Sequence, residues 1–118
     1  SGFLLGCSKE NNEQDPDVSV TIESPAENQN FNNGETVNLK AVINSNVSVH
    51  GYEIMLHDKT KGNSGSLANK HVHGNKVDVA HSWQVSDLEP KDIEVEIIVN
   101  IDHSGVNHSQ KLKISYNK

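Results

Sequence analysis

The strongest constraint on the fold of this chain is a repeated alternation of apolar and polar residues. The clearest example is Ile93 to Asp102, in which isoleucine or valine stands at every second position from 93 to 101. This period is typical of a β-strand with one buried face, because successive side chains of a strand point to opposite sides. Seven such runs occur: Val18 to Glu23, Thr36 to Asn44, Val49 to Asp58, Ser66 to Val72, Val77 to Val85, Ile93 to Asp102 and Ser109 to Tyr116.

The segments between these runs carry residues that favour turns, such as Asn32-Asn33-Gly34, Lys61-Gly62-Asn63 and Ser104-Gly105. Glycine and asparagine adopt the backbone conformations that tight turns require. Sustained helical spacing is not found in any window. The pattern therefore predicts an all-β fold, a seven-stranded antiparallel immunoglobulin-like β-sandwich.

Length and composition indicate one folded domain with a leading tether. Residues 8–17 contain no side chain that a core would bury, so we expect them to form a disordered, flexible tether. Residues 18–118 then form the sandwich domain, a common size for a single core. A net charge of −6 argues against nucleic acid as a partner, because binding to phosphates needs a basic surface.

The segment Leu4-Leu5-Gly6-Cys7 resembles the lipobox of bacterial lipoproteins. The resemblance implies that residues 1–7 are the remains of a signal peptide and that Cys7 is the lipidated residue. It also implies a protein held by its lipid anchor to a membrane of the bacterial cell envelope, namely the outer membrane, on the periplasmic or the surface side. The acidic segment after Cys7 is similar to the export signal of Bacteroidetes surface lipoproteins.

A second resemblance covers the first third of the domain. Val20 to Ala26 ends in Ser-Pro-Ala, and Phe31 to Ala41 places a phenylalanine before Gly-Glu and then an alternating strand. These features resemble bacterial Ig-like modules. The resemblance implies the same sandwich fold and is a signal of fold, since one fold serves many functions.

Histidines are the residues on which a chemical function could depend. The strand order predicts that loops at one end of the sandwich gather five of the seven histidines: His50, His71, His73, His103 and His108. Neutral imidazoles bind Zn²⁺ or Cu²⁺, and His71 and His73 are two residues apart, so they share one side of an extended segment. We expect His81 on the face of Val79 and Trp83, and His57 at the opposite end.

Two functions of different class follow from this pattern. In the first, the domain binds zinc or copper(II) through the clustered histidines without catalysis. In the second, it is a surface interaction or adhesion module that contacts another envelope or host protein, and the histidines are incidental. A cluster of histidines that responds to pH without binding a metal is a further alternative for these residues. We do not expect an enzyme, because Gly62 to Ser66 is interpreted as a flexible loop with no base placed beside Ser64.

Overall fold

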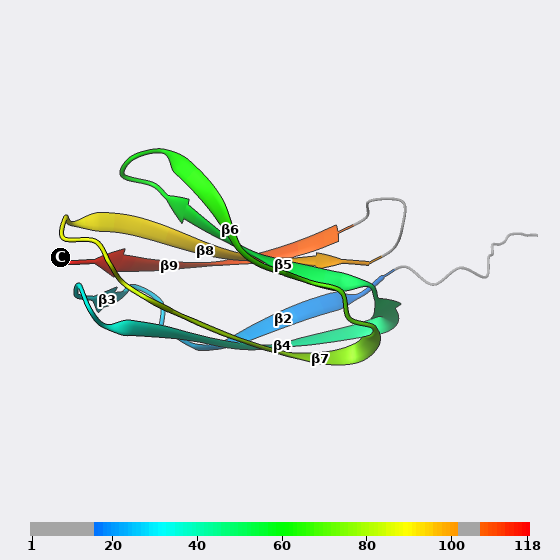
Figure 1. The fold of residues 1–118 in the computed structure, drawn as a ribbon. Coiled ribbons are helices and arrows are strands. Elements are labelled where there is room, and N and C mark those ends of the chain that lie inside the picture. Colours follow the sequence, from blue (N-terminus) through cyan, green and yellow to red (C-terminus); the bar gives the residue numbers. More distant parts are fainter. Residues whose placement is uncertain (1–15, 102–106) are drawn as a thin grey trace, which may run out of the picture.

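The computed structural model describes residues 16–101 and 107–118. This part of the chain is built from strands joined by turns (Figure 1). Their bounds are β2 Val18–Ser24, β3 Gln29–Phe31, β4 Thr36–Val49, β5 Gly51–Asp58, β6 Asn63–Lys70, β7 Gly74–Gln84, β8 Lys91–Asn100 and β9 Asn107–Tyr116. No helix in these two ranges is long and apolar enough to cross a membrane. The predicted tether and lipobox lie mostly outside the described residues.

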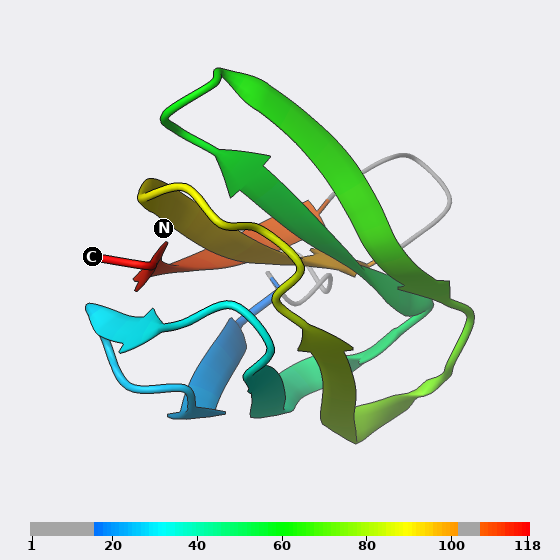
Figure 2. The ribbon, with the colours of Figure 1, turned by 60° about the vertical axis from the view of Figure 1, so that its left-hand side comes forward.

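The strands form two sheets that face each other. One sheet has the order β2-β4-β7, and the other has the order β3-β9-β8-β5-β6. Figure 1 shows the two layers along their length, and Figure 2 shows β6 and β7 on the same side of the sandwich. The prediction of an immunoglobulin-like β-sandwich is confirmed.

The structure differs from the predicted strands in three places. β3 was not predicted, and it pairs in parallel with the end of β9, through Gln29 opposite Ile114 and Phe31 opposite Tyr116. Three residues are too few for an alternation to be recognised. β4 continues beyond Asn44 to Val49, because its ladder with β7 resumes after an irregularity with Val49 opposite Gly74. The weak run expected from Ser66 is shifted towards the N-terminus, since β6 begins at Asn63.

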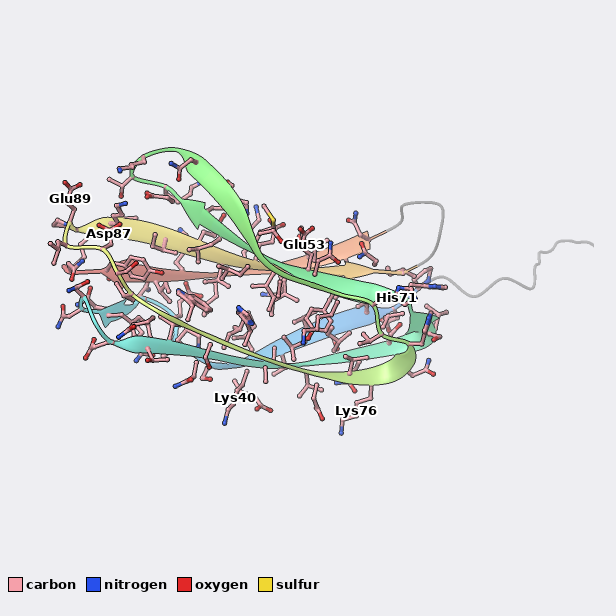
Figure 3. All side chains as sticks on the ribbon, in the orientation of Figure 1. Lys40, Glu53, His71, Lys76, Asp87 and Glu89 are labelled. Atoms are coloured by element: carbon pink, nitrogen blue, oxygen red, sulfur yellow. The ribbon has the colours of Figure 1, made fainter. Side chains whose placement is uncertain are left out.

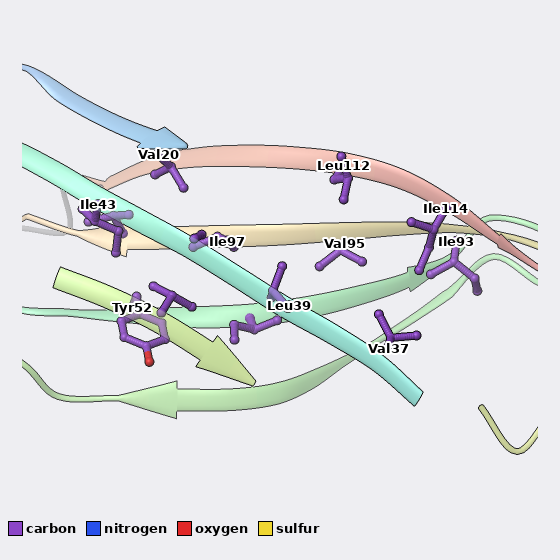
Figure 4. Close-up of a cluster of buried hydrophobic side chains, with 14 of the residues drawn as sticks. Val20, Val37, Leu39, Ile43, Tyr52, Ile93, Val95, Ile97, Leu112 and Ile114 are labelled. Atoms are coloured by element: carbon purple, nitrogen blue, oxygen red, sulfur yellow. The ribbon is translucent and has the colours of Figure 1, made fainter. Parts of the chain in front are cut away.

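The core lies between the sheets and follows the predicted alternation. On β8, the odd-numbered residues from Ile93 to Val99 are buried, and the residues between them are exposed or half-buried. β4 supplies the facing side chains from the other sheet. Figure 4 shows these side chains meeting between the layers. The fully buried residues among them include Val37, Leu39, Ile43, Ile54, Val95, Ile97 and Val99.

Candidate functional site

Three of the five predicted histidines meet at one end of the sandwich. His50 lies between β4 and β5, and His71 and His73 lie in the link between β6 and β7. The Nε2 atoms of His71 and His73 are 3.1 Å apart, and their ring centroids are separated by 4.7 Å. The ring of His50 lies edge-on to that of His73, with 5.2 Å between centroids. In Figure 3, His71 marks this end, and Asp87 and Glu89 mark the opposite end.

Gly51 allows this convergence. A Cβ atom added at Gly51 would lie 2.5 Å from the carbonyl oxygen of Lys70 and 3.4 Å from the Cα atom of His71. The glycine also has a φ of 158°, which residues with side chains rarely adopt. The beginning of β5 can therefore pass directly beside the chain that leaves β6. This contact brings His50 next to the His71–His73 segment.

The other predicted ligands do not complete a cluster in the described chain. His108 is half-buried on β9 opposite Val99, which itself pairs with Tyr52 of β5. His108 is thus two strands away from the beginning of β5. His103 lies outside the described residues. Within residues 16–101 and 107–118, no group of three or more histidine, cysteine, aspartate or glutamate side chains could hold a metal ion.

His57 forms a hydrogen-bonded chain that the sequence did not reveal. Its Nε2 atom is 2.8 Å from Oε1 of Glu96, and its Nδ1 atom is 2.6 Å from Oγ of Ser64. Because the ionised carboxylate only accepts, Nε2 donates to Glu96. The Ser64 hydroxyl donates to Nδ1 when the ring is neutral, and Nδ1 donates to Oγ of Ser64 when the ring is charged. The interpretation of Gly62 to Ser66 as a flexible loop is wrong from Asn63 onwards, and so is the expectation that no base lies beside Ser64, because the His57 ring contacts its hydroxyl group. Ser64 belongs to β6 and is paired with His57 of β5.

The charge of Glu96 is stabilised by this chain. Burial disfavours the carboxylate, but hydrogen bonds with His57 and then with Ser109 outweigh burial, so the pKa of Glu96 lies below its usual value. The charged groups of His57 and Lys111 act in the same direction. Glu96 is consequently ionised near neutral pH and holds the His57 ring in place on the outer face of the five-stranded sheet.

The ion cluster around Lys91 was also not predicted from the sequence. The Lys91 side chain is 8 % exposed, and its Nζ atom lies 3.0 Å from Oδ2 of Asp58 and in contact with Asp87. Hydrogen bonds with Asp87 and Asp58 raise the pKa of Lys91. The bond with Lys91 is the main reason that the pKa of Asp87 is lowered. For Asp58, burial acts against ionisation, but the Lys61 N–H and the Lys91 ammonium outweigh it and lower the pKa.

A hollow of about 320 Å³ lies beside this cluster, under the β5–β6 hairpin. Leu56, Leu67, Ile93 and Tyr116 supply its apolar lining. The hydroxyl group of Tyr116 accepts a hydrogen bond of 2.8 Å from the indole N–H of Trp83. Trp83 is thus half-buried with its polar atom satisfied, as expected for an indole at the border of a core.

The side of the sandwich between β6 and β7 combines free strand edges with apolar side chains. Among the described strands, β6 ends one sheet and β7 ends the other, so each is paired with a described strand on one side only. Several half-buried residues from β5, β6, β7 and the intervening link pack against the core here, namely Leu56, Leu67, Ala68, Val72, Val77 and Trp83. His81 lies on the same face of β7 and stacks against Trp83 with 6.2 Å between ring centroids. We call this side, with its two edge strands, the open side.

Comparison with known proteins gives a family and a fold. Residues 19–97 match the model of the bacterial Ig domain family. Among solved structures, the fibronectin(III)-like modules of Clostridium thermocellum CbhA have a TM-score of 0.57 at 13% sequence identity. The match covers 84% of this chain and 46% of that one, and at such low identity it shows the fold alone. No curated protein matches the sequence significantly.

Proposed function

Because the chain belongs to the bacterial Ig domain family, we propose that it is a non-catalytic module that binds another protein at the bacterial cell envelope. The observation that carries the proposal is the outer edge of β7, along which no described strand pairs. An edge strand presents unpaired N–H and C=O groups to which another extended chain can add. The contact proposed for this module is the addition of a partner strand along β7.

The residues of β7 support this choice of edge. Lys76 and Asp78 are charged, but Val79 to Gln84 contain no lysine, arginine, aspartate, glutamate or proline. Charged residues and prolines are the usual protection of an edge strand against pairing. β6, the other edge strand of the open side, likewise has no charged residue before Lys70. An extended segment that pairs with residues 79–84 of β7 therefore meets no lysine, arginine, aspartate or glutamate of that strand.

The side chains of the open side indicate the chemistry of the partner. Trp83 and Leu67 are half-buried and pack against the core, so their remaining surface is apolar. In a strand added to β7, every second side chain would face this surface. The partner segment is thus an extended protein chain of low charge with alternating apolar residues.

The proposal includes attachment of the module to the outer membrane through a lipid on Cys7. Asp17 and Asn46 exchange hydrogen bonds at the end that holds His71, so the ten residues 8–17 lead to that end. Fully extended, they span about 35 Å at roughly 3.5 Å per residue. The β6–β7 link would then face the membrane. Replacing Cys7 by alanine in the full-length protein should abolish palmitate labelling, and persistent labelling would exclude this anchor.

Site-specific photocrosslinking in living cells tests the strand-addition proposal. A photoreactive residue at Ala80, which is exposed on β7, should give an adduct with another protein, and the adduct should disappear when Ser82→Lys is added to block the edge. The control position for the photoreactive residue is Thr21, which is exposed on β2 at the other edge of the same sheet. Absence of an adduct at Ala80, or equal adducts at Ala80 and Thr21, would overturn the proposal.

A further inference from the structure

We propose that His71 and His73 together chelate one divalent transition-metal ion, Zn²⁺ or Cu²⁺, through their Nε2 atoms. This site is narrower than the five-histidine cluster that the sequence predicts. It rests on a different observation from the strand-addition proposal and does not depend on it. With two protein ligands, the ion keeps open positions for water or for a donor from a partner.

The separation of the two donor atoms fits a shared ion. Two imidazole nitrogens at 2.0–2.1 Å from a tetrahedral zinc ion are about 3.3–3.4 Å apart. The observed distance between the Nε2 atoms is 3.1 Å, a few tenths of an ångström shorter. In the metal-free state one ring donates its Nε2–H to the Nε2 atom of the other ring. When an ion binds, that proton passes through solvent to the Nδ1 atom of the same ring, so that both neutral rings present an Nε2 lone pair to the ion. Little rearrangement of the rings is then needed for binding.

The backbone holds the two rings on the same side. Val72, between them, is half-buried and packs against the core, whereas His71 and His73 are exposed. In an extended segment, an inward residue places both of its neighbours outward. Gly51 approaches this segment closely on one side, and the Gly74 N–H donates a 3.1 Å hydrogen bond to the hydroxyl group of Ser48 after His73. The segment that carries both rings is consequently held to the sandwich at two points, beside Gly51 and at Ser48.

His50 restricts the ring of His73. The two rings meet edge to face at an interplanar angle of 76°, and His50 is itself fixed by its backbone N–H, which donates a 2.8 Å hydrogen bond to the carbonyl of Asn100. A ring that is already oriented loses less conformational entropy when it binds an ion. This is why the pair should bind better than two isolated surface histidines.

The site is tested by titrating the metal-free full chain with Cu²⁺. Binding is followed by electron paramagnetic resonance and by calorimetry. We expect one ion per chain, with hyperfine coupling to two imidazole nitrogens. His71→Ala and His73→Ala should each weaken binding at least tenfold. Both residues are exposed, so we expect the two variants to keep the fold, and circular dichroism checks this.

His108→Ala is the matched control, because the sequence predicts His108 as a ligand, whereas the structure places it on β9, two strands away from the beginning of β5. Its removal should leave the affinity for Cu²⁺ unchanged. Affinity that survives both His71→Ala and His73→Ala would overturn the site. Equal weakening by His108→Ala would also overturn it, since the ion would then lie elsewhere. Calorimetry with Zn²⁺ should rank the parent and the variants in the same order of affinity as with Cu²⁺.

Discussion

Truncation of Ile97 tests the register of the central strand most directly. Ile97 has no exposed surface and lies on β8, which is paired with β5 on one side and with β9 on the other. Its neighbour Ile98 has the same side chain but points to the outer face and is half-buried. A slip of β8 by one residue would exchange the two environments. Comparison of the two alanine variants thus measures which face is the core.

The expected cost of Ile97→Ala follows from the atoms removed. Loss of three buried carbon atoms at ~0.8 kcal/mol each gives about 2.4 kcal/mol of transfer free energy. A void of about 70 Å³ that does not relax adds about 1.7 kcal/mol at ~24 cal/mol per Å³. The free energy of unfolding should therefore decrease by about 2.4–4.1 kcal/mol. Ile98 is only half-buried, so Ile98→Ala should lose half of this transfer free energy and create no void. Its expected decrease in the free energy of unfolding is about 1.2 kcal/mol.

Urea denaturation followed by Trp83 fluorescence measures these differences, because Trp83 is the single tryptophan and borders the core. A shift of the urea midpoint reports a change in stability alone when the slope of the unfolding free energy against urea concentration is unchanged. If Ile97→Ala proves too unstable to study, Ile97→Val should cost about 0.5–1.5 kcal/mol. A cost for Ile98→Ala equal to or greater than that for Ile97→Ala would refute the register and the core derived from it.

Two further predictions concern the ion pairs. Because the pKa of Glu96 is lowered in the folded state, its contribution to stability is complete above the unfolded pKa of about 4.3 and is lost as the pH falls through the folded pKa. In urea titrations Glu96→Gln should be less stable than the parent at pH 7, and the difference should decrease as the pH falls through the folded pKa; a constant difference would contradict the assignment. Lys91→Met should destabilise the fold at pH 7 because the Asp58 and Asp87 carboxylates lose their partner, and this penalty should decrease as the pH falls through the lowered pKa values of the two carboxyl groups. A penalty that does not depend on pH would show that lost packing, and not lost charge, is the cause.

The sequence by itself determined the fold class and most of the core. Alternation along Ile93 to Val99 predicts a strand with one buried face because side-chain direction is a local property of an extended backbone. The single-domain size and the acidic charge are equally independent of tertiary contacts. The position of His71 and His73 on one side of an extended segment was also predictable, since it depends on their spacing of two residues.

Only the tertiary structure decided which distant groups meet. Pairing of β3 with β9 joins residues separated by more than eighty positions, and the Lys91 cluster joins the beginning of β8 with the end of β5. The His57–Ser64 contact depends on the register of β5 with β6, and the distance between His50 and His73 depends on the close approach at Gly51. An apolar periodicity specifies which face of a strand is buried, but it carries no information about the partner strand or the register. Those are set by long-range packing of the complete sandwich.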